Sequence, residues 1–179
     1  MDAYILAGGK SQRFGSNKAL AFWQGKPFVI HQQNLLRPHF KRVYVIAARA
    51  ETYAGLNLDI IQDNYAECGP LGGLEAALQH TRHDWIFLAS CDTFGVTSHQ
   101  IQTLVSQCQQ QPAKADIYAW QYERIEPLWA CYARSLLTEV QKQLRQKQFA
   151  LQSLIKKSRA QIYLLDTPWL QVNHTADIP

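Results

Sequence analysis

The chain opens on a short apolar run that leads into a loop of glycines and cations, Leu6-Ala7-Gly8-Gly9-Lys10-Ser11-Gln12-Arg13-Phe14-Gly15-Ser16-Asn17-Lys18. Residues 3–7 predict a first β-strand, and the loop follows its carboxyl end. Paired glycines at such a point allow close backbone approach and unusual dihedral angles. Because ligands of open α/β sheets bind at this edge, the stretch predicts both the fold class and the side on which the site lies.

Strand-like and helix-like segments alternate along the first two thirds of the chain, and short strands and helices follow. The predicted strands after the first are 43–47, 58–61, 85–89, 116–121, 128–132 and 162–165. The predicted helices are 28–36, 71–80, 98–110, 135–146 and 151–157. This order predicts an α/β fold with one doubly wound, mostly parallel sheet. With 179 residues, no repeat and no linker, a single domain over residues 1–179 is expected.

The composition excludes several classes of protein. A hydrophobic share of 47% with ordinary glycine and proline content excludes collagen-like, disordered and coiled-coil chains. The absence of a long apolar run or a secretory signal predicts no membrane association. The net charge of +4 is spread along the chain, so nucleic-acid binding is not expected. The cysteines form no CxxC pair, which favours reduced thiols and a cytoplasmic location over zinc or disulfides.

The loop after the first strand has the chemistry of an anion site. Successive backbone N–H groups can surround phosphate oxygens, and Arg13 and Lys18 can neutralise their charge. The spacing matches neither G-x-G-x-x-G nor G-x-x-x-x-G-K-[ST], so a Rossmann dinucleotide site and a Walker A loop are not indicated. The alternative is a glycine-rich turn with surface cations.

Two further segments are expected at the same edge. Asp92 follows the apolar strand 85–89, and a carboxylate there suits the Mg²⁺ that phosphoryl transfer requires; the alternative is an aspartate that caps the next turn. Asp63 precedes Gly69-Pro70-Leu71, where a Gly-Pro turn opens a helix whose N-terminus attracts anions. Here the alternative is a tight loop-to-helix connection.

Residues 6–18 resemble the signature loop L-A-[GA]-G-x-[GS]-x-R-[ML]-x-x-x-K of nucleotidyltransferases that make sugar nucleotides and related dinucleotides. The form with two glycines and Ser11 is similar to the molybdenum cofactor guanylyltransferase family. The chain departs from it at Phe14, where Met is usual, and at Asn17, where Asp is usual. The resemblance implies a sheet of the nucleotide-diphospho-sugar transferase type.

The other segments support the same resemblance. Cys91-Asp92-Thr93 resembles the family's Cys-Asp-Thr-Pro, with Phe94 in place of Pro, and implies that Asp92 binds magnesium. Gly69-Pro70-Leu71 resembles the family's Gly-Pro-Leu-x-Gly segment, and Asp63 matches its nucleotide-binding aspartate. The related cytidylyltransferases lack that segment and carry Ala-Ala-Gly in the first loop, so the resemblance favours GTP.

Four positions near these segments differ from the family or match it weakly. Asn173 matches one residue of its Asn-x-Asn-Thr-Pro-Glu motif, and Gln171 replaces the first Asn. Ile46 stands where an Asn often contacts the nucleotide. Glu126, in Glu-Pro-Leu, replaces a polar amide or His on the pterin side.

The activity that the resemblance implies is transfer of GMP from GTP, with Mg²⁺, to molybdopterin, which gives the guanine dinucleotide and pyrophosphate. Arg13, Lys18 and Asp92 are the implied catalytic residues, with Asp92 as the metal ligand. The implied substrate and nucleotide site comprises Leu6, Ala7, Gly8, Gly9, Lys18, Asp63, Gly69, Pro70, Leu71, Asp92 and Asn173. Cofactor-inserting proteins and molybdoenzymes are the further partners. The alternatives are a CTP- or UTP-using nucleotidyltransferase of the same fold and a non-catalytic relative that binds nucleotide or cofactor.

Overall fold

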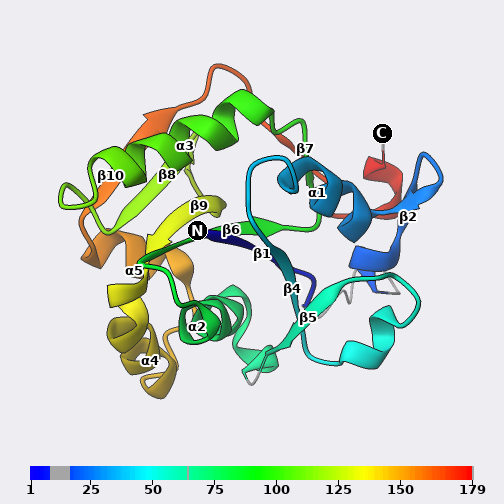
Figure 1. The fold of residues 1–179 in the computed structure, drawn as a ribbon, viewed down its shortest axis with the longest axis horizontal. Coiled ribbons are helices and arrows are strands. Elements are labelled where there is room, and N and C mark those ends of the chain that lie inside the picture. Colours follow the sequence, from blue (N-terminus) through cyan, green and yellow to red (C-terminus); the bar gives the residue numbers. More distant parts are fainter. Residues whose placement is uncertain (9–16, 64, 179) are drawn as a thin grey trace.

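A seven-stranded sheet forms the centre of the computed structural model, which describes residues 1–8, 17–63 and 65–178 (Figure 1). Across the sheet the strands are β10 (Ala160–Leu164), β8 (Ile117–Gln121), β9 (Ile125–Ala133), β6 (Trp85–Ser90), β1 (Asp2–Leu6), β4 (Val43–Ala47) and β5 (Asp59–Gln62). All run in one direction except β9, which is antiparallel to both neighbours. The predicted doubly wound, mostly parallel sheet is confirmed.

Helices cover both faces of the sheet and make three layers (Figure 1). On one face lie α1 (Phe28–Leu36) and α3 (Ser98–Gln110), and on the other α2 (Pro70–His80), α4 (Leu137–Arg145) and α5 (Leu151–Lys157). Both faces of the sheet are apolar, because successive side chains of a strand point to opposite faces. In β1, Ala3 and Ile5 belong to the core under α1 and α3, whereas Tyr4 and Leu6 belong to the core under α2, α4 and α5. No helix in the described ranges is both long and apolar enough to span a membrane.

The sequence patterns located the main elements to within a few residues and missed the small ones. Two short ribbons were not predicted: β2 (Phe22–Trp23) pairs with β3 (Lys26–Pro27), and β7 (Thr93–Phe94) pairs with β11 (Leu170–Gln171). The first ribbon turns at Gln24 and Gly25, both at positive φ, which is the geometry of a tight hairpin. The sequence Gln-Gly does not contain the Asn or Asp from which such a turn is usually predicted.

The described residues also form five 3-10 helices, four between the longer elements and one at the C-terminus: η1 (Lys18–Leu20), η2 (Ala50–Tyr53), η3 (Ala66–Cys68), η4 (Arg134–Leu136) and η5 (Thr175–Asp177). Because six of the seven strands run the same way, their carboxyl ends share one edge of the sheet. The antiparallel β9 begins at that edge, so the β8–β9 turn lies there as well. Loops from every part of the chain therefore meet along this edge.

Candidate active site at the carboxyl edge of the sheet

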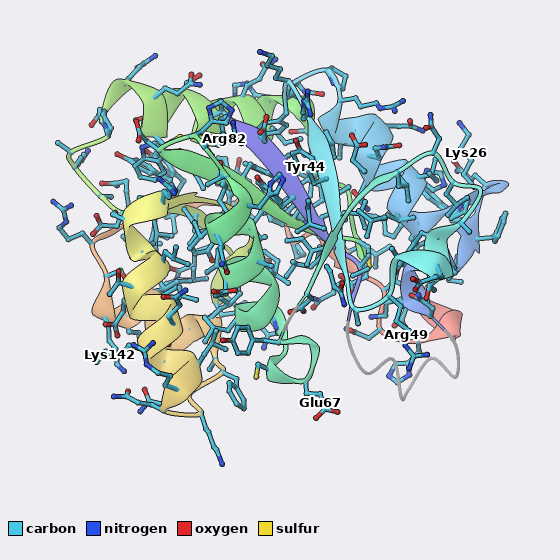
Figure 2. The ribbon with its side chains drawn as sticks, turned by 60° about the horizontal axis from the view of Figure 1, so that its bottom comes forward. Lys26, Tyr44, Arg49, Glu67, Arg82 and Lys142 are labelled. Carbon is cyan, nitrogen blue, oxygen red and sulfur yellow. The ribbon has the colours of Figure 1, made fainter. Side chains whose placement is uncertain are left out.

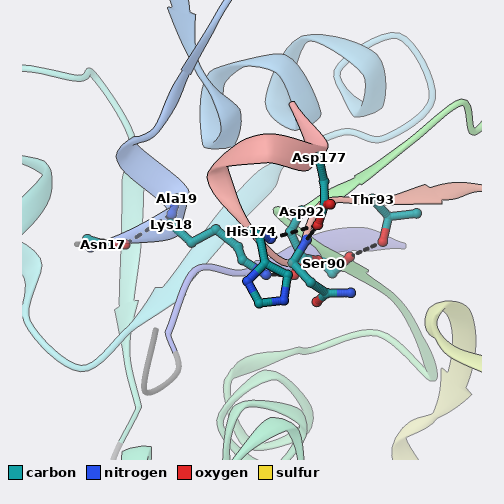
Figure 3. A network of polar contacts seen from close by, with 9 residues as sticks. Asn17, Lys18, Ala19, Ser90, Asp92, Thr93, His174 and Asp177 are labelled. Carbon is teal, nitrogen blue, oxygen red and sulfur yellow. Dashed lines mark hydrogen bonds and ion pairs between the residues drawn. The ribbon is translucent and has the colours of Figure 1, made fainter. Parts of the chain in front are cut away.

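An ion pair lies near the middle of this edge, where Lys18 Nζ is 2.8 Å from Asp92 Oδ2 (Figure 3). Lys18 begins η1 after the first loop, and Asp92 follows β6. The two side chains are only 15% and 18% exposed, so the pair is screened less by solvent than a surface pair. The structure thus brings together the predicted phosphate-binding cation and the predicted metal ligand.

The turn that carries Asp92 is held by several hydrogen bonds. The hydroxyls of Ser90 and Thr93 are 2.7 Å apart (Figure 3). Gln32 Nε2 donates to the Thr93 carbonyl at 2.8 Å. The backbone N–H of Val172 donates to the Asp92 carbonyl at 2.9 Å. Contacts from α1 and from the C-terminal segment therefore fix the position of this carboxylate.

A buried tyrosine holds the two described ends of the first loop. Tyr53, 4% exposed, donates its hydroxyl to the Ala7 carbonyl at 2.7 Å and accepts from Asn17 Nδ2 at 3.1 Å. Asn17 also caps η1, since its Oδ1 accepts the Ala19 N–H at 3.1 Å. An asparagine can accept at the cap and donate to Tyr53 at once, which an ionised aspartate cannot do. This explains the departure at Asn17.

Tyr53 was not found from the sequence. Burial raises the pKa of its phenol, so the hydroxyl stays protonated as a donor. Its role depends on η2 lying close to the end of the first strand, where the hydroxyl contacts Ala7, and no local pattern around residue 53 predicts that contact.

Five predicted residues line one small pocket, which we call the β1–β4 pocket. Its walls are Leu6, Gly8, Ile46, Asp63, Gly69, Pro70 and Gly73. Burial raises the pKa of the Asp63 carboxyl, whose Oδ1 accepts the Tyr65 N–H at 2.8 Å. Ile46 supplies an apolar wall where the family often has an Asn. At Gly8, a Cβ would meet no described atom within 4 Å, so the space above this glycine is open to a ligand.

Glycine is required at two places in the loop and helix behind this pocket. Gly69 precedes α2 with φ of 63°, which favours glycine. A Cβ on Gly72 would lie 2.4 Å from the Tyr65 carbonyl oxygen, a backbone atom that cannot turn away. The helix α2 therefore starts at Gly69-Pro70 as predicted, and the loop before it packs closely against the first turn of the helix.

The C-terminal segment closes over the ion pair. The N–H groups of Asn173 and His174 donate to Asp177 Oδ2 at 2.8 and 2.7 Å (Figure 3). These bonds, helped by the charge of Lys18, lower the pKa of the Asp177 carboxyl. Asn173 is exposed in the short segment that follows Val172, whose N–H binds the Asp92 backbone.

The remaining predicted residues that the structure describes do not line the β1–β4 pocket or belong to the ion pair. The side chain of Leu71 is fully buried in the core, so it offers no surface to a nucleotide and the predicted contact would fall to its backbone. The Ala7 N–H donates to the Ile46 carbonyl at 3.0 Å, and the Ala7 carbonyl accepts from the Tyr53 hydroxyl, so both groups have partners within the protein. Gly9 and Arg13 lie outside the described residues.

Two neighbours of Asp92 have structural roles. Cys91 is buried, and burial raises the pKa of its thiol, which excludes the reactive thiolate form. Phe94, in place of the family's Pro, packs its ring edge to face with Trp23 and Phe28, each at 4.9 Å between centroids. The aromatic ring thereby anchors the turn to the β2–β3 ribbon.

Charged side chains of both signs stand on neighbouring loops. Figure 2 shows Arg49, after β4, and Glu67, before α2, on the same side of the molecule. Arg49 is exposed and was not singled out from the sequence. The described part of the chain holds no group of three or more His, Cys, Asp or Glu side chains that could bind a metal alone.

The chain combines a three-layer α/β fold, a glycine loop after the first strand and a Lys–Asp pair at the carboxyl edge of the sheet. These features are typical of proteins that bind nucleotide phosphates at that edge. Residues 3–162 match the family model of the MobA-like NTP transferase domain. The chain belongs to this family.

The chain is similar to known proteins along most of its length. A protein of Deinococcus radiodurans, named as a probable molybdenum cofactor guanylyltransferase, is 36% identical over 141 residues, which cover 78% of this chain and 71% of that protein. A molybdenum cofactor guanylyltransferase of Pseudomonas paraeruginosa is 32% identical over 148 residues, 79% and 73% of the two chains. The crystal structure of molybdopterin-guanine dinucleotide biosynthesis protein A from Archaeoglobus fulgidus superposes with a TM-score of 0.84 at 20% identity, over 99% of this chain and 95% of that one.

Proposed function

We propose that this protein transfers GMP from GTP to molybdopterin and so forms the guanine dinucleotide and pyrophosphate. The observation that carries the proposal is the position of the Lys18–Asp92 pair at the sheet edge that also holds the β1–β4 pocket. The family membership and the names of the relatives support the same reaction.

The β1–β4 pocket is the proposed site of the guanine base. Gly8 and Gly69 leave room beside the backbone, and Asp63 supplies a carboxylate that can accept from the N–H groups of guanine. The N-terminus of α2 faces the same pocket through Gly69 and Pro70, so its partial positive charge favours the phosphates nearby. Lys18 then neutralises triphosphate charge, with Arg13 as a second cation.

Mg²⁺ is the proposed metal, and the residues fit it. This ion is commonly held by one or two carboxylates together with substrate phosphates and water, so a complete protein cage is not required. Within the described part of the chain, Asp92 Oδ1 has no hydrogen-bond partner, whereas Oδ2 binds Lys18. Bound at Asp92, the ion would offset negative charge on the phosphates.

The reaction needs positioning more than acid–base chemistry. An oxygen of the acceptor's terminal phosphate is already anionic and forms a bond to the α-phosphorus, while the α–β bridging bond breaks and pyrophosphate leaves. No proton has to be removed by the protein. Lys18 and Asp92 therefore act by orienting the reactants and balancing their charge.

The test is pyrophosphate release with molybdopterin, Mg²⁺ and GTP, CTP, UTP or ATP in turn. Release is expected with GTP alone. In Asp92→Asn it should fall by about 100-fold or more, in a variant that still unfolds cooperatively. Asp84→Asn is the matched control, because Asp84 is an exposed carboxylate just before β6, at the opposite end of that strand, and its substitution should leave turnover at the wild-type rate.

Other outcomes separate the alternatives. Release with CTP or UTP in place of GTP would assign the chain to another nucleotide. GTP binding without release from any triphosphate would indicate a carrier and contradict the enzymatic proposal. Delivery of the product to cofactor-inserting proteins or molybdoenzymes, and a cytoplasmic location, stay predictions.

A further inference from the structure

A second pocket lies on the other side of Asp92, between the β8–β9 turn and the segment after β10. We call it the β8–β9 pocket; its walls include Thr93, Arg124, Glu126, Trp169 and Gln171. The strand order places it, because β1, β4 and β5 lie on one side of β6, and β9, β8 and β10 on the other. Asp92, at the end of β6, therefore stands between the β1–β4 pocket and this one.

The size of the β8–β9 pocket suits one ring system. Its volume is ≈ 180 Å³, below the roughly 300–1,000 Å³ of pockets that enclose drug-sized ligands. Trp169 forms a fixed aromatic wall, since its Nε1 donates to Gln100 Oε1 at 3.1 Å and its ring packs edge to face against Trp129. A flat heterocycle can pack against such a ring.

Glu126 lines this pocket from the start of β9, a strand that is irregular further along. Trp120 pairs with Glu126 and Tyr118 pairs with Cys131, so extra residues of β9 bulge out between them. Within the bulge, Trp129 is fully buried with φ of 96°, a conformation that a large side chain rarely adopts. Glu126 itself lies at the carboxyl edge, because it is the second residue of β9 and pairs with Trp120 near the end of β8.

The Glu126 carboxylate has no hydrogen bond or ion pair with any residue of the described ranges. Burial raises the pKa of this half-buried carboxyl, and the charge of Arg124 partly offsets that effect. An unpaired carboxylate repels an anionic phosphate and accepts from N–H donors. The part of an acceptor that fits beside Glu126 is therefore its nitrogen-rich ring and not its phosphate.

We infer that the β8–β9 pocket holds the ring of the acceptor and that Glu126 is a specificity residue, which accepts from two adjacent N–H donors of a 2-amino-4-oxo pyrimidine edge. The inference rests on the proposed function, because it takes the acceptor to be a pterin. A carboxylate can accept from the exocyclic amine and the neighbouring ring N–H together, as two charge-assisted hydrogen bonds. A glutamine would instead pair with one N–H and one carbonyl oxygen.

Two fluorescent probes test this pairing without turnover. Pterin carries the 2-amino group, and lumazine carries a second carbonyl oxygen in its place. With GTP present, the wild-type protein is expected to bind pterin about tenfold or more tightly than lumazine. The reason is that lumazine lacks the donor for one charged hydrogen bond to Glu126. Glu126→Gln should abolish or reverse that preference while its affinity for GTP stays within twofold.

Controls keep the result specific. Glu139→Gln is the matched control, since Glu139 lies on α4 and, among the described residues, pairs only with Lys142 at the surface; it should keep the wild-type preference for pterin. Equal binding of the two probes by the wild type, or an unchanged preference in Glu126→Gln, would overturn the role of Glu126. A loss of GTP affinity in that variant would place Glu126 at the base of GTP and overturn the inference too. Pyrophosphate release measured in parallel reports on the proposed function separately.

Discussion

At the scale of single residues, the Tyr53 hydroxyl connects the backbone after β1 to the residue before Lys18. It bonds to Ala7 on one side and Asn17 on the other. Lys18 is the next residue in the chain, and its Nζ reaches Asp92. The position of the phosphate-binding cation therefore depends on a tyrosine that comes 35 residues later in the sequence.

We expect Tyr53→Phe to raise the KM for GTP roughly tenfold, because a displacement of Lys18 weakens its alignment with the phosphates. The free energy of unfolding should fall by about 1–3 kcal/mol, since the buried Ala7 carbonyl loses its donor. Steady-state kinetics and urea unfolding measure both effects. Tyr44→Phe is the control: its hydroxyl contacts Arg42 on the face of the sheet that bears α2, and the KM should not change. Equal KM values in the two variants would contradict the role of Tyr53.

At the scale of elements, the packing of α2 against α4 contains polar side chains in a buried place. Glu75 of α2 is 2% exposed and accepts one hydrogen bond, from Gln141 of α4, at 2.9 Å. Gln143, two residues further along α4, is fully buried, and neither of its amide atoms has a partner among the described residues. The two glutamines therefore contribute to stability with opposite sign.

Gln143→Met should increase the free energy of unfolding by about 1–3 kcal/mol, because it removes unsatisfied buried polar atoms at similar volume. Gln141→Met should decrease it by about the same amount, because the buried Glu75 carboxylate loses its donor. Met and Gln have similar helix propensities, so the pair of variants isolates the polar contacts. Urea unfolding measures the change, and destabilisation by Gln143→Met would show that its amide has a partner.

At the scale of the whole molecule, an ion pair fastens the edge strand β10 to the rest of the sheet. Arg159 donates to both carboxylate oxygens of Asp116, at 3.0 and 2.7 Å, just before β10 and β8 begin. The guanidinium lowers the pKa of the Asp116 carboxyl. The folded state thus favours the ionised form, so this contribution to stability is present above the unfolded pKa of about 3.9 and is lost as the pH falls through the folded value.

Arg159→Met should accordingly destabilise the protein at pH 7, and the difference from wild type should vanish in acid, below the folded pKa of Asp116. Thermal or urea unfolding measures this difference. The pH range, roughly 2–7, covers the titration of one aspartate. Arg134→Met is the control, because Arg134 is exposed and its side chain forms no ion pair among the described residues. A difference that is independent of pH would mean that Arg159 acts by packing alone.

Local sequence patterns were enough to predict the main elements and the edge of the sheet at which the site forms. Alternating strand and helix patterns predicted the sheet and its covering helices, because side-chain periodicity is a local property. The glycine loop, Asp92 and Gly69-Pro70 each follow a strand or open a helix, so the direction of the parallel strands sends them to one edge. Their resemblance to a family supplied the implied activity.

Which side chains meet depends on the folded arrangement of the whole chain. It paired Lys18 with Asp92, used the Ala7 backbone and the Leu71 side chain for packing, and brought Tyr53 to the first loop. It also placed the β8–β9 turn, and with it Glu126, in a pocket across from the β1–β4 pocket. These contacts join residues far apart in the chain through strand order and register. No local pattern encodes strand order or register, because both depend on how the whole core packs.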